Sequence, residues 1–228
     1  MKKYVIVVAG GDGKRMRSGM PKQFLCIGGI PILMRSIKAF HEYEKTISII
    51  LVLPKGKIGT WQKLCKTHKF IVPHTITAGG STRFQSVKNG LALIMENDSL
   101  VAIHDGVRPL VSREVIQRVF FEGARHGTAV PCVKLNDSLR MLTGNISAPL
   151  KRDQICAIQT PQCFRCNILK KAYKQKYNER FTDDATVVEN LNEKIYMVEG
   201  NAENIKITTR VDLAVAKALL NFKKDADT

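Results

Sequence analysis

A short apolar strand that runs directly into a glycine-rich turn constrains this chain more than any other feature. The expected strand covers residues 3–9, and Gly10-Gly11-Asp12-Gly13 follows it. Glycines let backbone N–H groups approach a ligand with no Cβ atom in between. Successive N–H groups of such a turn form a concave site for an anion. The sequence therefore predicts a phosphate-binding turn at the end of the first strand, contributed by Ala9, Gly10, Gly11, Asp12 and Gly13.

Basic side chains beside this turn favour a nucleoside triphosphate as the anion. Arg15 and Lys22 add full positive charge where the backbone supplies only dipoles. No Gly-x-x-x-x-Gly-Lys-Ser/Thr string occurs, which excludes a Walker loop. A dinucleotide-binding turn would need a third glycine where Met16 stands, which disfavours an NAD-dependent dehydrogenase. An ordinary turn with solvated cations is the alternative, and the Pro21-Lys22-Gln23 element disfavours it.

The composition fits one α/β domain that spans residues 1–228. The chain is 44% hydrophobic and 25% charged, as in an ordinary globular protein. Its formal net charge of +16 suits either nucleic acid or small polyanionic substrates. The basic residues are spread along the chain, and no aromatic residues interleave with them as in a base-stacking surface. We therefore expect small phosphorylated substrates and no nucleic-acid partner.

Apolar runs and cysteines bear on the location of the protein. The longest apolar runs, such as residues 47–53, are too short to cross a bilayer. No small-residue cleavage site follows the first apolar run, so the sequence predicts a cytoplasmic protein without a membrane partner. The six cysteines are then expected as free thiols. Cys163 and Cys166 have C-x-x-C spacing, but a zinc site would need a suitably spaced second pair, and no protein metal site is predicted.

Short Val- and Ile-rich runs alternate with helical patterns along the chain. Strands are expected near 3–9, 47–53, 71–77, 100–104, 128–134, 155–159 and 194–199. Helices are expected near 32–43, 59–68, 82–96, 112–126, 166–178, 183–191 and 209–222. This alternation predicts a mostly parallel sheet with helices on both faces, in a Rossmann-like α/β fold. Ligands bind at the carboxyl ends of the strands of such sheets, where the glycine-rich turn lies.

Three local patterns refine this expectation. Ser112 and the pair Thr209 and Asp212 have the spacing of helix caps. Met95 continues the apolar face of the helix at 82–96, so we expect it in the core. Residues 135–155 break the alternation and read as two extended arms around a turn at Gly144. We expect this β-arm to project from the domain and to contact a partner subunit.

Other expected strand and helix ends carry groups that suit nucleotides and phosphates. Gly79-Gly80-Ser81-Thr82-Arg83 opens a helix that bears Ser86, and helix N-termini bind anions. Asp105 is suited to a ribose or a hydrated metal ion, and Arg108 to a phosphate. We expect His104 as a buried, hydrogen-bonded residue rather than a base. Thr182-Asp183-Asp184 fits a functional site or a helix cap, and both readings stay open.

These motifs together resemble the 2-C-methyl-D-erythritol 4-phosphate cytidylyltransferase family. The resemblance runs from residue 4 to about 220 and rests on six elements in register. They are residues 9–23, Gly79-Gly80-x-x-Arg83-x-x-Ser86-Val87, His104-Asp105-x-x-Arg108-Pro109, Gln159-Thr160-Pro161-Gln162, Thr182-Asp183-Asp184, and Glu199-Gly200 with Lys206-Ile207-Thr208. The resemblance implies a nucleotidyltransferase fold, a homodimer joined through the arm, and transfer of a cytidylyl group from CTP in isoprenoid synthesis with Mg²⁺ bound mainly through the CTP phosphates.

The resemblance also implies roles for individual residues. Arg15, Lys22 and Lys206 are similar to the catalytic cations of the family, and Lys206 also to a residue that holds the second substrate. The implied nucleotide-binding residues are Ala9, Gly10, Gly11, Asp12, Gly13, Gly80, Ser81, Arg83, Ser86, Asp105 and Gly106. The implied binding residues for the polyol phosphate are Arg108, Ser138, Arg152, Thr182 and Lys206. Arg152 is expected to act in the neighbouring subunit.

The chemistry of this reaction agrees with the residue pattern. An ionised phosphate is already a nucleophile, so no general base is required. The chain shows no Ser–His or Cys–His nucleophile pattern, which agrees with direct displacement of pyrophosphate. Preorganised arginine and lysine side chains meet the need to neutralise charge on phosphorus. A ribitol 5-phosphate cytidylyltransferase is the alternative, because the shared motifs separate the two polyol phosphates poorly.

Overall fold

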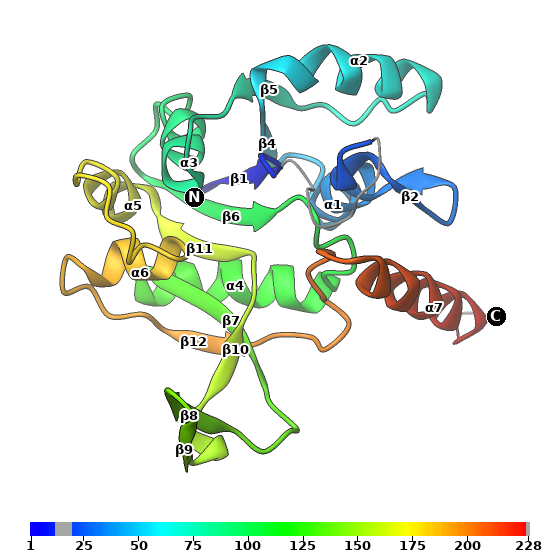
Figure 1. Cartoon of the computed structure of the whole chain (residues 1–228). Coiled ribbons are helices and arrows are strands. Elements are labelled where there is room, and N and C mark those ends of the chain that lie inside the picture. The colour runs from blue at the N-terminus through cyan, green and yellow to red at the C-terminus, as the bar shows by residue number, and fades with distance from the viewer. Residues whose placement is uncertain (12–19, 227–228) are drawn as a thin grey trace.

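A computed structural model describes residues 1–11 and 20–226, and a mixed, mostly parallel sheet forms its centre (Figure 1). The strand order is β10-β7-β11-β6-β1-β4-β5, and β12 pairs with β7. The pairs β1–β4, β1–β6, β4–β5 and β7–β12 are parallel. The strands are β1 (Lys2–Val8), β4 (Ser48–Leu53), β5 (Thr75–Ala78), β6 (Ser99–Asp105), β7 (Thr128–Lys134), β10 (Cys156–Ile158), β11 (Gln162–Arg165) and β12 (Met197–Glu199). The predicted fold class is confirmed.

Helices cover both faces of this sheet, and alternate residues of β1 show it most directly. Val5 and Val7 belong to a core cluster with α1, α2 and α4, whereas Tyr4 and Ile6 belong to a second cluster with α3, α5 and α6. A third cluster joins α7 to the loops beside α1. The helices are α1 (Ile32–Tyr43), α2 (Ile58–Thr67), α3 (Arg83–Leu91), α4 (Arg113–His126), α5 (Cys166–Ala172), α6 (Asp184–Glu189) and α7 (Arg210–Ala226). Short 3-10 helices are η2 (Lys22–Phe24), η3 (Lys55–Lys57) and η4 (Arg152–Gln154).

Two strands of the central sheet differ most from the sequence prediction. Strand β11 was not expected, because it is short, has polar residues at both ends, and pairs antiparallel with both β6 and β7. The predicted strand at 71–77 begins instead at Thr75. Ile71 is 90% exposed and lies before the strand, so its apolar character does not mark a core position.

Two helices end several residues earlier than expected, and one predicted core residue is wrong. Helix α3 ends at Leu91 and α5 ends at Ala172, rather than at 96 and 178. Ile94 remains buried after α3, but Met95 is 81% exposed because the chain has left the helical path that would keep it on the buried face.

The predicted helix caps are confirmed. The Ser112 hydroxyl accepts a hydrogen bond from the Val115 N–H at 3.3 Å. At the start of α7, the Thr209 N–H donates to the Asp212 carboxylate at 2.8 Å, and the Asp212 N–H donates to Thr209 Oγ1 at 3.2 Å. This reciprocal pair satisfies donors that the first turn of a helix leaves without intrahelical partners.

The predicted arm is present as a hairpin that projects beyond β7 and β10 (Figure 1). Its strands β8 (Arg140–Thr143) and β9 (Ile146–Pro149) pair antiparallel around Gly144, which has a φ of +60°. A small two-stranded sheet of β2 (Cys26–Ile27) and β3 (Ile30–Pro31) lies before α1. Met141, Leu142 and Ile146 of the arm are exposed. An exposed apolar hairpin of this kind suits contact with another chain.

Two further expectations concern membranes and cysteines. Within residues 1–11 and 20–226, no helix has both the length and the apolar character needed to cross a bilayer. All six cysteines are free thiols. Cys163 and Cys166 are buried in different core clusters, so their C-x-x-C spacing serves packing on the two faces of the sheet.

Candidate active site

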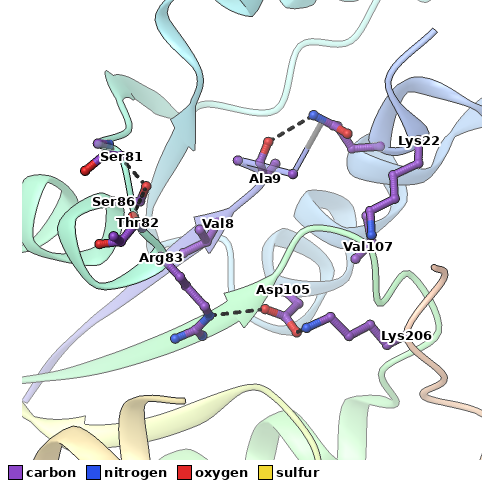
Figure 2. Close-up of a pocket in the computed structure, with 14 residues that line it drawn as sticks. Val8, Ala9, Lys22, Ser81, Thr82, Arg83, Ser86, Asp105, Val107 and Lys206 are labelled. Atoms are coloured by element: carbon purple, nitrogen blue, oxygen red, sulfur yellow. Dashed lines mark hydrogen bonds and ion pairs between the residues drawn. The ribbon is translucent and has the colours of Figure 1, made fainter. Parts of the chain in front are cut away.

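A cavity of about 330 Å³ lies at the carboxyl ends of β1 and β6 (Figure 2). It brings together residues from the first turn, the Gly79-Gly80 turn, the end of β6 and the segment after β12. The predicted site residues that line it are Ala9, Gly10, Gly11, Lys22, Gly80, Ser81, Arg83, Ser86, Asp105 and Lys206. The cavity therefore collects most of the predicted nucleotide-binding residues and two of the three predicted catalytic residues.

Asp105 is the centre of a charge cluster at one wall of this cavity. Its carboxylate lies 2.8 Å from Lys206 Nζ, 3.7 Å from Arg83 Nε and 3.6 Å from Arg108 Nε. Burial opposes ionisation of Asp105, but the charges of Arg83, Lys206 and Arg108 outweigh it and hold its pKa well below the usual range. The carboxylate is therefore ionised at neutral pH, and it fixes three cations around one point.

A buried ion pair anchors Arg83 from the opposite side. The Asp184 carboxylate accepts hydrogen bonds from Arg83 Nη1 at 2.9 Å and Nη2 at 2.6 Å, and from the Tyr173 hydroxyl at 2.6 Å. Asp184 is fully buried. Burial lowers the pKa of the Arg83 guanidinium, but Asp184 and Asp105 more than compensate and raise it. Two carboxylates thus hold this arginine in one orientation.

The Gly79-Gly80 turn is shaped by the start of α3. Ser86 Oγ accepts a hydrogen bond from the Gly80 N–H at 3.2 Å and donates to the Thr82 carbonyl at 2.9 Å. A Cβ atom at Gly79 would lie 2.8 Å from Ser86 Oγ, and one at Gly80 would lie 2.1 Å from the Gln85 side chain. The close packing of this turn against α3 therefore requires glycine at both positions.

Lys22 and Gln23 belong to η2, which faces the end of β1. Gln23 is 1% exposed, and its Nε2 donates to the Ala9 carbonyl at 3.0 Å. This contact ties the helix that carries Lys22 to the first strand. Sequence reasoning assigned no role to Gln23, although its place beside Lys22 in the Pro-Lys-Gln element offered a signal.

His104 is structural, as expected. It is fully buried and packs edge-on against Phe40. Its Nε2 lies 3.0 Å from the Arg108 carbonyl and therefore donates, so Nδ1 accepts from the Thr160 hydroxyl at 3.1 Å. Burial lowers the pKa of His104 to about 4, and the imidazole is neutral at pH 7.

Several predicted site residues do not line the cavity. Gly106 lies beside it, where a Cβ atom would meet Leu33 at 2.8 Å. Arg108 is almost buried, and its Nη1 donates to the Asn204 carbonyl at 2.6 Å. Thr182 is exposed just before α6. Asp12, Gly13 and Arg15 lie outside the described residues.

The two predicted arm residues lie apart from the cavity. Ser138 and Arg152 are both exposed. Arg152 Nη1 donates to the Asn136 carbonyl at 2.5 Å, within the same arm. The structure of one chain therefore does not bring the arm residues together with Lys22 or Lys206.

The Thr182-Asp183-Asp184 motif divides between the two readings that the sequence left open. Asp183 caps α6 in a capping box with Thr186, so the helix-cap reading holds for this residue. Asp184 holds Arg83 of the cavity wall, which is a role beyond capping. Its partner lies 101 residues away, so no local pattern could identify the pair.

The donor set of the cavity fits a divalent cation that brings most of its own ligands. Among the described residues that line it, Asp105 is the only carboxylate. No group of three or more His, Cys, Asp or Glu side chains in residues 1–11 and 20–226 is arranged to hold a metal ion. Oxygen donors are what Mg²⁺ prefers, and in nucleotide sites it commonly joins one or two carboxylates to phosphate oxygens and waters.

Known proteins resemble this chain over almost its whole length. A sequence model of the 2-C-methyl-D-erythritol 4-phosphate cytidylyltransferase family matches residues 3–222. The protein of that description from Bacteroides fragilis is 50% identical over 220 residues, which are 96% of this chain and 100% of the relative. The solved 4-diphosphocytidyl-2C-methyl-D-erythritol synthase of Anaerococcus prevotii has a TM-score of 0.83 at 26% identity and 96% coverage of both chains. The Thermus thermophilus cytidylyltransferase has a TM-score of 0.78 at 30% identity, over 96% of this chain and 98% of its own.

Proposed function

The chain belongs to the 2-C-methyl-D-erythritol 4-phosphate cytidylyltransferase family, and from this premise we propose how its residues carry the reaction. The enzyme transfers the cytidylyl group of CTP to 2-C-methyl-D-erythritol 4-phosphate in the non-mevalonate pathway. The related proteins are named for methylerythritol phosphate, so the comparisons favour it over ribitol 5-phosphate. In the reaction, a phosphate oxygen bonds to the α-phosphorus of CTP while the bond to the β-phosphate breaks, and pyrophosphate leaves.

The observation that carries the proposal is the placement of two lysines on one cavity. Lys22 extends from η2 and Lys206 from the segment after β12, and both line the cavity below the end of β1 (Figure 2). Charge grows on the oxygens of the α-phosphate as the new bond forms. Cations fixed beforehand stabilise that charge without reorganising during the reaction. We assign Lys22 and Lys206 this role, together with Arg15, whose assignment rests on the sequence motif.

The glycine turns are proposed to bind the nucleotide. Residues 9–11 and Gly80 line the cavity, and Ser86 shapes the Gly79-Gly80 turn. Asp12 and Gly13 continue the first turn in sequence. Asp105 lines the cavity, and we assign it and the adjacent Gly106 to the ribose or phosphate part of CTP. Such a small backbone-walled pocket favours a pyrimidine over a purine base.

Mg²⁺ is proposed to enter with the CTP phosphates. Asp105 is the protein carboxylate that would contact it, and the other ligands would be phosphate oxygens and water. When bound, the ion neutralises phosphate charge. Lys206, held 2.8 Å from Asp105, keeps its ammonium group at the same wall.

The second substrate is proposed to bind between the core of one subunit and the arm of another. Arg108 and Thr182 belong to the core, and Ser138 and Arg152 belong to the arm. The exposed apolar residues of the hairpin suit a homodimer contact. A cytoplasmic location stays a prediction of the sequence.

Pyrophosphate release tests the proposal with purified protein. We expect release with CTP and methylerythritol phosphate, and much less when ribitol 5-phosphate or ATP replaces the matching substrate. Comparable release with ATP would contradict the proposed nucleotide pocket. Release that continues unchanged after chelation of divalent cations would contradict the role of Mg²⁺.

A further inference from the structure

The segment Gln159-Thr160-Pro161-Gln162 carries three buried polar side chains that line no part of the cavity. It connects β10 to β11, and Gln159, Thr160 and Gln162 are 5%, 5% and 1% exposed. Buried polar groups are costly unless they find hydrogen-bond partners. Each of these three side chains finds its partners in a different loop of the active site.

Gln159 holds the segment that leads to Lys206. Its Nε2 donates to the Asn201 carbonyl at 2.9 Å, and its Oε1 accepts from the Asn201 N–H at 3.3 Å and from Asn204 Nδ2 at 3.4 Å. A Cβ atom at Gly200 would lie 2.4 Å from Gln159 Oε1. The glycine therefore lets the amide of Gln159 lie directly against the backbone of this segment.

Asn204 connects Gln159 to Arg108 and to the chain beside Lys206. It is fully buried, and its Nδ2 also donates to the Thr160 carbonyl at 2.8 Å. Its own carbonyl accepts from Arg108 Nη1 at 2.6 Å. On the other side of Lys206, the Ile207 N–H donates to the Val107 carbonyl at 3.0 Å. Lys206 is thus held on a short stretch of chain that is fixed at both ends.

Thr160 and Gln162 hold the two neighbouring loops. Thr160 Oγ1 accepts from the Asp105 N–H at 3.0 Å, at the end of β6. Gln162 Nε2 donates to the Asp183 carboxylate at 2.8 Å, and its Oε1 accepts from the Ala185 N–H at 2.9 Å. Gln162 therefore fixes the turn that carries Thr182.

We propose that Gln159 and Gln162 are positioning residues for the transferase reaction. Gln159 sets the place of Lys206, and Gln162 sets the place of Thr182, although neither glutamine lines the cavity. The inference rests on the proposed roles of Lys206 and Thr182. It explains why a motif outside the cavity carries two glutamines. Each amide must donate a hydrogen bond through Nε2 and accept one through Oε1.

Backbone exchange and kinetics test the role of Gln159 together. Gln159→Met keeps the length of the side chain and removes its hydrogen bonds. We expect faster amide hydrogen exchange at Asn201 and across residues 203–207. Misplacing Lys206 should lower kcat by about 10- to 100-fold, with a smaller change in the KM for CTP. Gln117→Met, an identical change on the exposed face of α4, is the matched control and should change neither quantity.

A second variant disturbs the same contact in a different way, in case Gln159→Met does not fold. Gly200→Ala retains the glutamine at position 159 but puts a methyl group 2.4 Å from its Oε1, which displaces the amide from the segment. This variant should show the same faster exchange and the same loss in kcat. Unchanged exchange across 201–207 in both folded variants overturns the proposal. Loss of thermal stability with kcat within about twofold of normal also overturns it, because a structural role alone would then suffice.

A double-mutant cycle separates this inference from the proposed role of Lys206. If Gln159 acts through Lys206, adding Gln159→Met to Lys206→Ala should lower kcat little further, rather than multiply the two losses. Fully multiplied losses overturn the coupling. If Lys206→Ala alone leaves kcat unchanged, the proposed function of Lys206 fails, and the exchange measurement still decides whether Gln159 holds the segment.

Gln162 should give the complementary kinetic result. We expect Gln162→Met to speed exchange at the Ala185 amide and to raise the KM for methylerythritol phosphate by about tenfold. The KM for CTP should change much less. A rise confined to the KM for CTP, or no change in exchange at Ala185, overturns the assignment of Gln162 to the Thr182 turn.

Discussion

The cavity at the end of the sheet and the projecting arm contrast in how their charged residues are held. In the cavity, Asp105 is buried and joined to Arg83, Arg108 and Lys206, which come from three other positions in the chain. In the arm, Arg152 is exposed and donates to a carbonyl of its own hairpin. Charges that are fixed before the substrate arrives suit catalysis, whereas exposed charges on a projecting hairpin suit a contact that is still to be made.

This difference agrees with the proposal that CTP binds in the cavity and that the arm contributes to the site of the polyol phosphate. Most of the described groups proposed to bind CTP line one cavity within a single chain. The two arm residues proposed to complete the polyol phosphate site, Ser138 and Arg152, are exposed. Leu142 and Ile146 of the same arm are exposed as well. The nucleotide side of the proposed site is thus preformed, and the proposal assigns the rest of it in part to a second subunit.

The largest effect is expected from removing a cation of the preformed nucleotide side. Lys22→Ala should lower kcat by about 10²–10³, because a preorganised donor aimed at developing charge contributes about 2.7–4 kcal/mol. The KM for CTP should change far less, since the charge grows in the transition state. Steady-state pyrophosphate release measures both constants. Lys55→Ala, at an exposed lysine of η3, is the matched control. Near-normal kcat in Lys22→Ala would remove this residue from the catalytic role.

The second largest effect is expected on stability at acidic pH, and it comes from the buried His104, which precedes Asp105 in β6. The pKa of His104 is lowered by burial to about 4 in the folded protein, whereas an unfolded histidine titrates near pH 6.5. The unfolded chain therefore binds more protons as the pH falls below about 6.5, and stability is lost until the pH passes about 4. Between pH 7 and pH 4.5 this loss should be about 2–3 kcal/mol.

Denaturant unfolding of the enzyme and of His104→Gln at both pH values measures this contribution. The variant lacks the titrating ring, so the enzyme should lose about 2–3 kcal/mol more than the variant on acidification. Equal losses in the two proteins would show that His104 is not the group that makes the preformed nucleotide side sensitive to acid.

The sequence predicts the parts of the cavity that depend on neighbouring residues. Glycine pairs such as Gly79 and Gly80 mark a backbone approach that other residues would block, and caps such as Ser112 act within one turn. Contacts between distant segments leave no such mark. The Arg83–Asp184 pair spans 101 residues, and strand β11 depends on antiparallel pairing with both β6 and β7. The family motif singles out Asp184, but it does not show that this residue binds Arg83.

A third effect concerns the arm. If Arg152 of one subunit holds the phosphate of the second substrate in another, Arg152→Ala should raise the KM for methylerythritol phosphate by about 10- to 100-fold. Hydrogen bonds to charged groups contribute about 1.5–3 kcal/mol, and most of that range corresponds to about 10- to 100-fold. The KM for CTP should stay nearly unchanged. An equal rise in both KM values would contradict the division of the two substrates between cavity and arm.

Mixed dimers show whether Arg152 acts in its own subunit. If Arg152 acts across subunits, a heterodimer of co-expressed Arg152→Ala and Lys22→Ala chains has one site with both functional residues and one site with neither. The activity of a heterodimer can then recover to at most about half of normal, because only one of its two sites is intact. Verified heterodimers without activity above either parent would exclude action across subunits.

The smallest effect is expected at the apolar tip of the arm, and it separates dimer contact from folding. Ile146 on β9 is 77% exposed in the single chain, so Ile146→Ser should change the unfolding free energy of the monomer by less than about 0.5 kcal/mol. If a second subunit covers Ile146, the loss of its apolar surface should weaken dimerisation by about 1–2 kcal/mol, or about 5- to 30-fold in the dissociation constant. Ile71→Ser is the matched control, because Ile71 is 90% exposed and lies before β5, outside the arm. Sedimentation over a range of protein concentrations measures the dissociation constants of both variants. A dissociation constant that is unchanged in Ile146→Ser, or equally raised in Ile71→Ser, would contradict dimerisation through the arm.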